Sequence, residues 1–145
     1  MTEVMDSSFQ EPIPISEHTM YFDSFRVGGA IHLETRFTFQ RNGKWKAYSK
    51  IKTAQTSFRP VVSLSLEFFM RDTGYQVPIA NDLQDWGPKE LWRKRFQSQE
   101  ERQITCAGTS KFLAGHFDQL VNEGEGKLRM GLSRKKSLLR RLLPH

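Results

Sequence analysis

The chain has 145 residues, 37% of them hydrophobic and 12% aromatic, which is enough to bury the core of one domain and excludes a compositionally disordered protein. A single cysteine, Cys106, excludes an intramolecular disulfide framework. The net charge of +6 is concentrated at one end, because residues 127–145 hold seven Lys or Arg and no Asp or Glu.

Residues 1–19 contain four acidic residues, two prolines and no Lys or Arg, which predicts a flexible acidic arm. This segment lacks the cationic start and the apolar run of a signal peptide. No stretch of the chain approaches the roughly 18 apolar residues of a membrane span. We therefore expect an intracellular protein that is soluble or peripheral to a membrane.

A single β-rich globular domain is predicted over residues 20–122. Its first strand is expected at residues 20–27. The clearest signal follows at residues 31–40, where apolar and polar residues alternate as they do in a half-buried strand. Asn42-Gly43 then predicts a hairpin turn into a second strand.

The register of this hairpin follows from keeping apolar residues on one face. A two-residue turn would place Phe39 opposite Lys46, whereas a three-residue loop with Gly43 in the left-handed conformation places Phe39 opposite Trp45. We therefore predict a loop of residues 41–43. The expected pairs are Phe39 with Trp45, Phe37 with Ala47, Leu33 with Ile51 and, on the outer face, Glu34 with Lys50.

A second hairpin is predicted from residues 62–70 and 75–79, joined by a loop at residues 71–74. Pro78 cannot donate a hydrogen bond to a ladder, so the returning strand is expected to be short or to lie at an edge. The expected pairs are Met70 with Tyr75, Phe68 with Val77 and Leu66 with Ile79.

Helices are expected late in the chain. Gly87-Pro88 predicts the start of a short helix with Leu91, Trp92, Arg95 and Phe96 on one face. A strand over residues 102–107 follows. Ser110 then predicts the cap of a second helix, whose apolar face is Leu113, Phe117, Leu120 and Val121.

The order of these elements favours a mainly β protein, a β-rich α+β fold with one or two short late helices. Its antiparallel hairpins fit either a sandwich or a small barrel, and the pattern alone does not decide between them. Residues 123–126, Glu-Gly-Glu-Gly, predict a hinge between this domain and the basic C-terminal tail.

Residues 127–145 predict a basic amphipathic helix. At 100° per residue, five leucines fall within about 100° of the helix circumference. They are Leu128, Leu132, Leu139, Leu142 and Leu143. The cations are Lys127, Arg129, Arg134, Lys135, Lys136, Arg140 and Arg141. Three interpretations stay open: the leucines pack on the protein's own sheet, the helix binds an anionic membrane or an acidic protein, or the cations follow nucleic-acid phosphates.

A second basic surface is predicted on the outer face of the first hairpin. It holds His32, Arg36, Lys46, Lys50 and Lys52, with Tyr48 among them. Basic and aromatic side chains together on a sheet face are typical of proteins that bind single-stranded nucleic acid. They also fit the ordinary solvated face of an antiparallel sheet.

The sequence indicates no catalytic residue, metal or cofactor. The four histidines are scattered without metal-ligand spacing, and no nucleophile stands beside a base. Our leading hypothesis is therefore a non-enzymatic binding module that its tail attaches to an anionic membrane or an acidic protein. The alternatives are a nucleic-acid-binding protein that uses the basic sheet face and the tail, and a small enzyme with a site near Trp86, Trp92 and His116. Nothing in the sequence indicates the oligomeric state.

Overall fold

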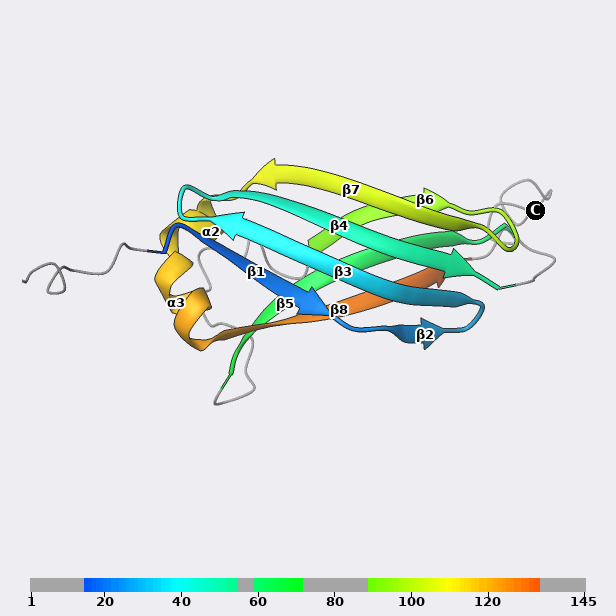
Figure 1. The fold of residues 1–145 in the computed structure, drawn as a ribbon, viewed down its shortest axis with the longest axis horizontal. Helices are drawn as coiled ribbons and strands as arrows, with labels where there is room; N and C mark the ends of the chain where they lie inside the picture. Colours follow the sequence, from blue (N-terminus) through cyan, green and yellow to red (C-terminus); the bar gives the residue numbers. More distant parts are fainter. Residues whose placement is uncertain (1–14, 55–58, 72–88, 134–145) are drawn as a thin grey trace, which may run out of the picture.

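The computed structural model describes residues 15–54, 59–71 and 89–133. Over these residues the fold is mainly β, as predicted, and consists of two antiparallel sheets that face each other (Figure 1). The sheets are not joined into a closed barrel. Of the two architectures that the sequence left open, the chain therefore adopts the sandwich.

The larger sheet has five strands in the order β1-β3-β4-β7, with the short β2 pairing beside the start of β3. Its strands are β1 (Glu17–Phe22), β2 (Phe25–Val27), β3 (Ala30–Gln40), β4 (Lys44–Thr53) and β7 (Glu101–Thr109). The smaller sheet has the order β6-β5-β8 and consists of β5 (Val61–Met70), β6 (Lys89–Arg95) and β8 (Gly124–Ser133).

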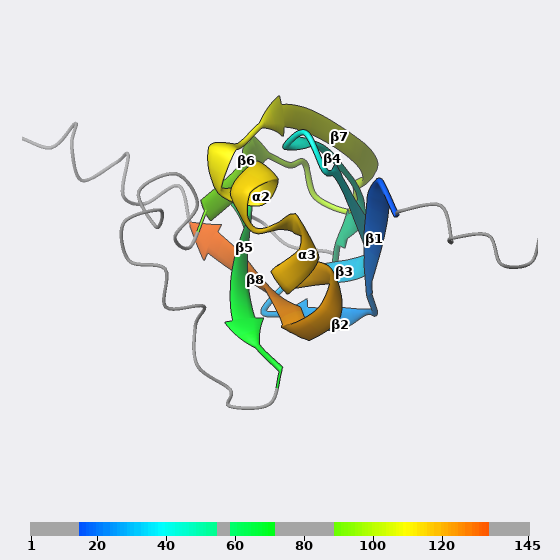
Figure 2. The ribbon, with the colours of Figure 1, turned by 90° about the vertical axis from the view of Figure 1, so that its left-hand side faces the viewer.

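Two short helices, α2 (Lys111–Gly115) and α3 (Phe117–Glu123), connect β7 of one sheet to β8 of the other and cover one end of the sandwich (Figure 2). The predicted cap is confirmed, because Ser110 Oγ accepts a hydrogen bond from the Leu113 amide at 3.2 Å. Phe112, Leu113, Phe117 and Leu120 are buried, so the helices close the core at this end.

The first hairpin has the predicted register over most of its length. Phe39 pairs with Trp45, Phe37 with Ala47 and Glu34 with Lys50. The three-residue loop is also confirmed, with Gly43 at a φ of 91°. A side chain at Gly43 would collide with the carbonyl oxygen of Ser110, so both the conformation and the close approach require glycine.

The start of this hairpin differs from the prediction. Ile51 pairs with His32 rather than with Leu33, because a β-bulge lies between His32 and Glu34. His32, expected on the outer face, is completely buried. Its Nδ1 lies 2.9 Å from the Asp23 carbonyl oxygen and its Nε2 lies 2.6 Å from Thr35 Oγ1. These two partners satisfy the ring, which makes its burial tolerable.

The predicted strand at residues 62–70 is confirmed as part of β5, but its partners are not the expected ones. Leu66 pairs with Lys89 of β6 and with Leu128 of β8, so β5 has a neighbouring strand on each side at this position. The predicted pair of Leu66 with Ile79 is therefore wrong. Residues 75–79 lie outside the described residues. The central strand of the smaller sheet is thus paired with segments far away in the sequence.

The helix predicted after Pro88 is wrong, since Lys89–Arg95 form strand β6. The register of β6 against β5 shifts between Leu64 and Ser65, where the partners change from Trp92 to Glu90. Leu91 and Trp92 are both buried at this irregularity, and Phe96 is buried after the strand ends. An irregular strand therefore produced apolar spacing that resembled a helical face.

The predicted hinge at residues 123–126 and the predicted helix over residues 127–133 are also wrong. Glu123 ends α3, and β8 pairs with β5 from the Met70–Gly124 pair to the Val61–Ser133 pair. Leu128 and Leu132 pack against the core as one face of β8, and Lys127 and Arg129 lie on its other face. The other predicted tail residues, Arg134, Lys135, Lys136, Leu139, Arg140, Arg141, Leu142 and Leu143, lie outside the described residues.

The acidic arm is shorter than predicted at its C-terminal end. Glu17, His18 and Thr19 belong to β1 and pair with Gln40, Phe39 and Thr38. The described sandwich therefore extends from residue 17 to residue 133, with interruptions at residues 55–58 and 72–88.

Candidate functional site

The outer face of β4 carries a row of cations. Along this strand Trp45, Ala47, Ser49, Ile51 and Thr53 lie toward the interior. The alternate positions face outward and are Lys44, Lys46, Tyr48, Lys50 and Lys52. Successive outward side chains on a strand are about 7 Å apart. The middle of the larger sheet therefore presents two pairs of lysines, Lys44 with Lys46 and Lys50 with Lys52, one pair on each side of Tyr48.

An aromatic and arginine row crosses these lysines at Tyr48. The strand registers place Tyr21 of β1, Arg36 of β3, Tyr48 of β4 and Thr105 of β7 side by side. The guanidinium carbon of Arg36 lies 4.5 Å from the centre of the Tyr48 ring, a cation–π contact. Tyr21 is 73% exposed. Two flat groups, the Tyr21 ring and the Arg36 guanidinium, are thus held on the outside of the sheet.

We call this surface the basic sheet face; it consists of Tyr21, Arg36, Lys44, Lys46, Tyr48, Lys50 and Lys52. A shallow groove of about 390 Å³ crosses it between Tyr21 and Tyr48. A neighbouring depression of about 420 Å³ shares Glu17, Thr38 and Lys46 with the first and continues toward Trp45. The two depressions together follow the strand direction, so the surface is open and elongated rather than an enclosed pocket.

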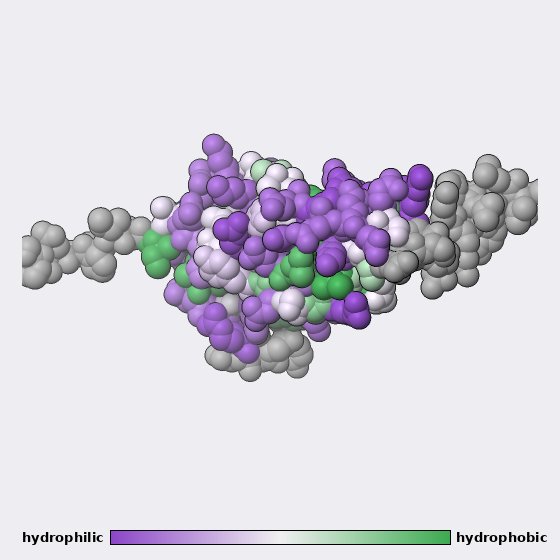
Figure 3. Space-filling view, turned by 45° about the vertical axis from the view of Figure 1, so that its right-hand side comes forward, coloured by the Kyte–Doolittle hydropathy of each residue, from purple (hydrophilic) through white to green (hydrophobic). Residues whose placement is uncertain are grey.

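Glu17, Glu34 and Glu101 share the outer side of this sheet with the cations, but most of the cations form no ion pair with a described residue. Lys50 forms an ion pair with Glu101 at 3.5 Å. Among the described residues, no carboxylate lies within ion-pair distance of Arg36, Lys44, Lys46 or Lys52. Hydrophilic residues cover most of the side and end of the molecule seen in Figure 3, around a small apolar area.

The sequence predicted much of this surface. Arg36, Lys46, Lys50 and Lys52 were expected together, and the structure places all four on the outer side of β3 and β4. Lys44 was missed, although it continues the same alternation. Tyr21 was also missed, because its place beside Arg36 depends on the pairing of β1 with β3, which no local pattern indicates.

The outer face of the smaller sheet is also cationic, but its arginines are paired. Arg129 contacts Glu67 at 3.2 Å and Arg93 contacts Glu90 at 2.9 Å. We call this surface the opposite sheet face; it contains Ser63, Ser65, Glu67, Glu90, Arg93, Lys127 and Arg129. Of the predicted tail cations, Lys127 and Arg129 therefore lie on this face.

Two of the three residues considered for an enzyme site are described, and each lies beside a hydrogen-bond partner. Trp92 is buried, and its indole nitrogen donates to Ser49 Oγ at 3.5 Å, while His116 Nδ1 lies 2.9 Å from the Phe112 carbonyl oxygen. Burial raises the pKa of the Cys106 thiol, and nearby Lys94 lowers it by less, so the reactive thiolate is disfavoured. Trp86 lies outside the described residues.

The part of the chain that the structure describes lacks two further features. It contains no group of three or more His, Cys, Asp or Glu side chains placed to hold a metal ion. None of its helices combines the length and apolar character that crossing a membrane requires.

The comparisons with known proteins found no matching family model, no matching curated protein and no matching solved structure. The function is therefore argued from the geometry and charge of the basic sheet face.

Proposed function

We propose that this protein is a non-enzymatic binding module whose basic sheet face binds single-stranded nucleic acid. The observation that carries the proposal is the crossing of two rows at Tyr48: lysines along β4, and Tyr21 with Arg36 across the sheet. Phosphate groups and bases differ in chemistry, and the two rows supply a partner for each.

The lysine row suits a phosphate backbone. Its lysines stand about 7 Å apart within each pair and about 13 Å apart across Tyr48, so they form a linear array of cations along β4. Lys44, Lys46 and Lys52 have no ion-pair partner among the described carboxylates, so a bound phosphate would displace only water and counterions. Binding of this kind weakens as the salt concentration rises.

The transverse row suits bases. Unpaired bases stack on aromatic rings and on arginine guanidinium planes, and neither surface selects strongly for sequence. Tyr21 offers an exposed ring, and Tyr48 supports the guanidinium of Arg36 from below. Hydroxyl groups of Thr19, Thr38 and Thr105 border the groove and can hydrogen-bond to sugars or base edges.

Attachment to an anionic membrane or an acidic protein was the leading expectation from the sequence. Residues 127–133 of the helix expected for this attachment belong to strand β8. The attachment hypothesis therefore depends on residues 134–145 alone. Exposed tyrosine also occurs at membrane and protein interfaces, but the linear array of lysines along one strand favours a linear polyanion. We therefore treat these partners as alternative outcomes of the test.

The test is a titration of the full chain into fluorescent oligo-dT and oligo-U of about ten nucleotides, followed by anisotropy across a salt series. Lys46→Ala combined with Lys52→Ala should lower the slope of log K against log salt by about 1.4, which is about 0.7 for each lost phosphate contact on a single strand. The matched control is Lys111→Ala combined with Lys127→Ala, which removes two exposed lysines elsewhere and should leave the slope nearly unchanged.

Parallel titrations use duplex DNA of the same length and vesicles of equimolar phosphatidylserine and phosphatidylcholine. Stronger binding to single strands than to either competitor supports the proposal. Equal effects of the two double variants, or binding to vesicles alone, would contradict it.

A further inference from the structure

At one end of the sandwich, three arginines are connected through main-chain carbonyl groups. Nη1 of Arg102 donates to the carbonyl oxygen of Arg95 at 2.9 Å, and Nη1 of Arg95 donates to the carbonyl oxygen of Arg59 at 2.8 Å. The guanidinium carbon of Arg102 also lies 5.0 Å from the centre of the Phe96 ring. The side chains of Arg95 and Arg102 are therefore held beside the turn that joins β6 to β7, and the backbone of Arg59 lies next to Arg95.

Carbonyl groups orient a guanidinium without cancelling its charge. Glu100 and Glu101 are the nearby acids, and each is already engaged: Glu100 accepts from the Gln97 amide and lies 3.8 Å from Arg102, while Glu101 pairs with Lys50. Among the described residues, no carboxylate lies within ion-pair distance of Arg59 or Arg95. The like charges of this cluster repel one another, and a bound anion would relieve that repulsion.

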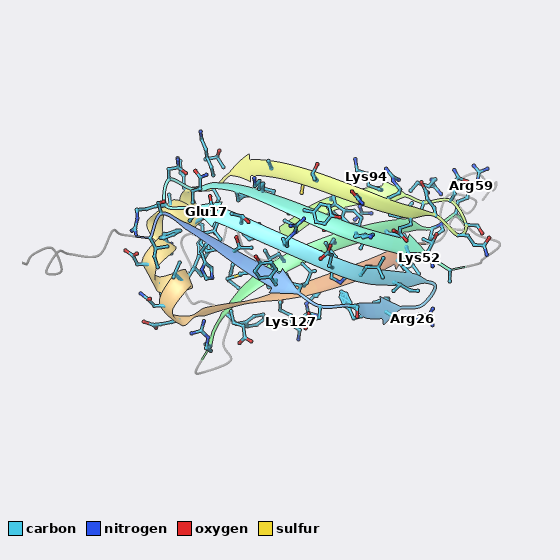
Figure 4. The ribbon with its side chains drawn as sticks, viewed as in Figure 1. Glu17, Arg26, Lys52, Arg59, Lys94 and Lys127 are labelled. Atoms are coloured by element: carbon cyan, nitrogen blue, oxygen red, sulfur yellow. The ribbon has the colours of Figure 1, made fainter. Side chains whose placement is uncertain are left out.

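Two lysines add to this cluster. Lys52 is the last outward residue of β4, and its backbone pairs with Glu101, next to Arg102. Lys94 precedes Arg95 on β6. Figure 4 shows Lys52, Arg59 and Lys94 toward the same end of the sandwich, with Glu17 at the other end. We call Lys52, Arg59, Lys94, Arg95 and Arg102 the basic end.

We propose that the basic end is a second phosphate-binding site, which takes the nucleotides of a single strand that extend past Lys52. This inference rests on the proposed function, since Lys52 belongs both to the lysine row and to the basic end. Arginine suits this task because its planar fork can hold a phosphate through two hydrogen bonds. Arg95 uses Nη1 for a carbonyl group, and no described residue accepts a hydrogen bond from its Nε or Nη2.

The geometry predicts a dependence on strand length. The lysine row from Lys44 to Lys52 spans about 26 Å, at about 3.3 Å per residue, and this accommodates about five nucleotides. A strand of about ten nucleotides, within the usual range for one single-strand site, would reach the basic end. A strand of about five nucleotides on the lysine row would end at Lys52 and would not reach Arg59 or Arg95.

The experiment measures binding of oligo-dT of about five and about ten nucleotides to the full chain and to Arg59→Ala combined with Arg95→Ala. For the longer strand, two lost phosphate contacts should lower the salt slope by about 1.4 and the affinity at about 0.1 M salt by up to roughly 25-fold. For the shorter strand, the affinity should stay within about twofold. Lys46→Ala is the comparison variant, because it should weaken both lengths.

The single variant Arg59→Ala tests the same site with a smaller change to the fold. It leaves the Arg59 carbonyl group in place as the acceptor for Arg95, and it should still lower the affinity for the longer strand by about fivefold. Circular dichroism and thermal unfolding establish that both variants are folded.

The outcomes separate the two proposals. If neither strand binds the wild-type chain, the proposed function fails and this inference fails with it. If both strands bind but the arginine variants affect neither, or affect both equally, the basic sheet face stands and the second site is refuted. Loss of phosphatidylserine vesicle binding in the arginine variants, with oligonucleotide binding intact, would also refute it.

Discussion

The outer faces of the two sheets both carry cations, but they differ in how many of these cations have an acidic partner. On the opposite sheet face, Arg93 and Arg129 lie beside glutamates that pair with them. On the basic sheet face, Lys50 alone has such a partner among the described residues. Exposed ion pairs add little stability, but they remove net charge from a surface. The comparison teaches that the arrangement of acids, as well as the number of cations, decides how much net positive charge a sheet face keeps.

Charge reversal of two lysines on the basic sheet face should have the largest effect on oligonucleotide affinity. Lys46→Glu combined with Lys52→Glu replaces two attractive contacts by two repulsive ones, and the affinity for oligo-dT at about 0.1 M salt should fall by roughly several hundred-fold. Anisotropy titration measures the change. Lys111→Glu combined with Lys127→Glu changes the net charge equally, and a loss of the same size in that control would show that only total charge matters.

Removal of the exposed ring should have the next largest effect. Tyr21→Ala should weaken oligonucleotide binding by about 5- to 150-fold, which corresponds to about 1–3 kcal/mol for one stacked base. Tyr21→Phe keeps the ring and should bind within a few-fold of the wild type. Because Tyr21 is 73% exposed, neither variant should alter the fold. Equal binding by Tyr21→Ala and the wild type would exclude stacking at this position.

The pH dependence of stability tests the burial of His32, which lies next to the β-bulge in β3. Desolvation lowers the pKa of His32, while the Asp23 carbonyl hydrogen bond and Glu34 raise it by less. Below a pH of about 6.5 the unfolded chain therefore binds a proton that the folded chain refuses, and the free energy of unfolding should fall by at most about 1.4 kcal/mol per pH unit for this histidine.

Urea unfolding between about pH 7.5 and pH 5 measures this loss, and NMR titration of the imidazole resonances assigns it to a residue. The pKa of His18 is also lowered, mainly by desolvation and then by Arg71, so His18→Gln separates the two contributions. Stability that stays constant or rises as the pH falls would contradict the neutral, buried state of His32.

Neutralising the acidic partner of a cation, first on one sheet face and then on the other, should have a smaller effect on oligonucleotide affinity. Glu101→Gln releases Lys50 on the basic sheet face and should tighten oligo-dT binding by about fivefold at about 0.1 M salt, one additional phosphate contact. Glu67→Gln releases Arg129 on the opposite sheet face and should change binding by less than twofold. The reverse order of effects would move the binding surface to the smaller sheet.

Deletion of residues 1–14 should have the smallest effect. This segment carries Glu3, Asp6 and Glu11 without any Lys or Arg, and the deletion stops before β1 begins at Glu17. Removing three negative charges should tighten binding by about two- to threefold at low salt, and the difference should disappear at high salt because exposed charges are screened. Weaker binding of the truncated chain would show that the segment contributes contacts instead.

The sequence predicted those features of the fold that depend on neighbouring residues. The alternation of residues 31–40, the loop at Gly43 and the cap at Ser110 are all local, and each is confirmed. The outward position of the β4 lysines could also be predicted, because they alternate with residues that face the core. The larger part of the basic sheet face was therefore available from one strand.

The errors arose where distant segments decide the structure. Residues 127–133 read Lys-Leu-Arg-Met-Gly-Leu-Ser, an alternation that fits a strand, but Leu128 and Leu132 also fit a helical face. Pairing with β5, which is about sixty positions away in the sequence, resolves this ambiguity. His32 is similar, because its burial depends on hydrogen bonds to Asp23 and Thr35 that alternation does not encode.

Mapping of oligo-dT binding by NMR is the most direct test of the account, because it reports which sheet a single strand contacts. The account predicts that backbone amide shifts change along β1, β3, β4 and β7 around Tyr21, Arg36 and Tyr48, while the amides of β5, β6 and β8 change little, apart from those next to Lys94 and Arg95. Changes concentrated in β5 and β8, or no changes at oligonucleotide concentrations that saturate known single-strand binders, would contradict it.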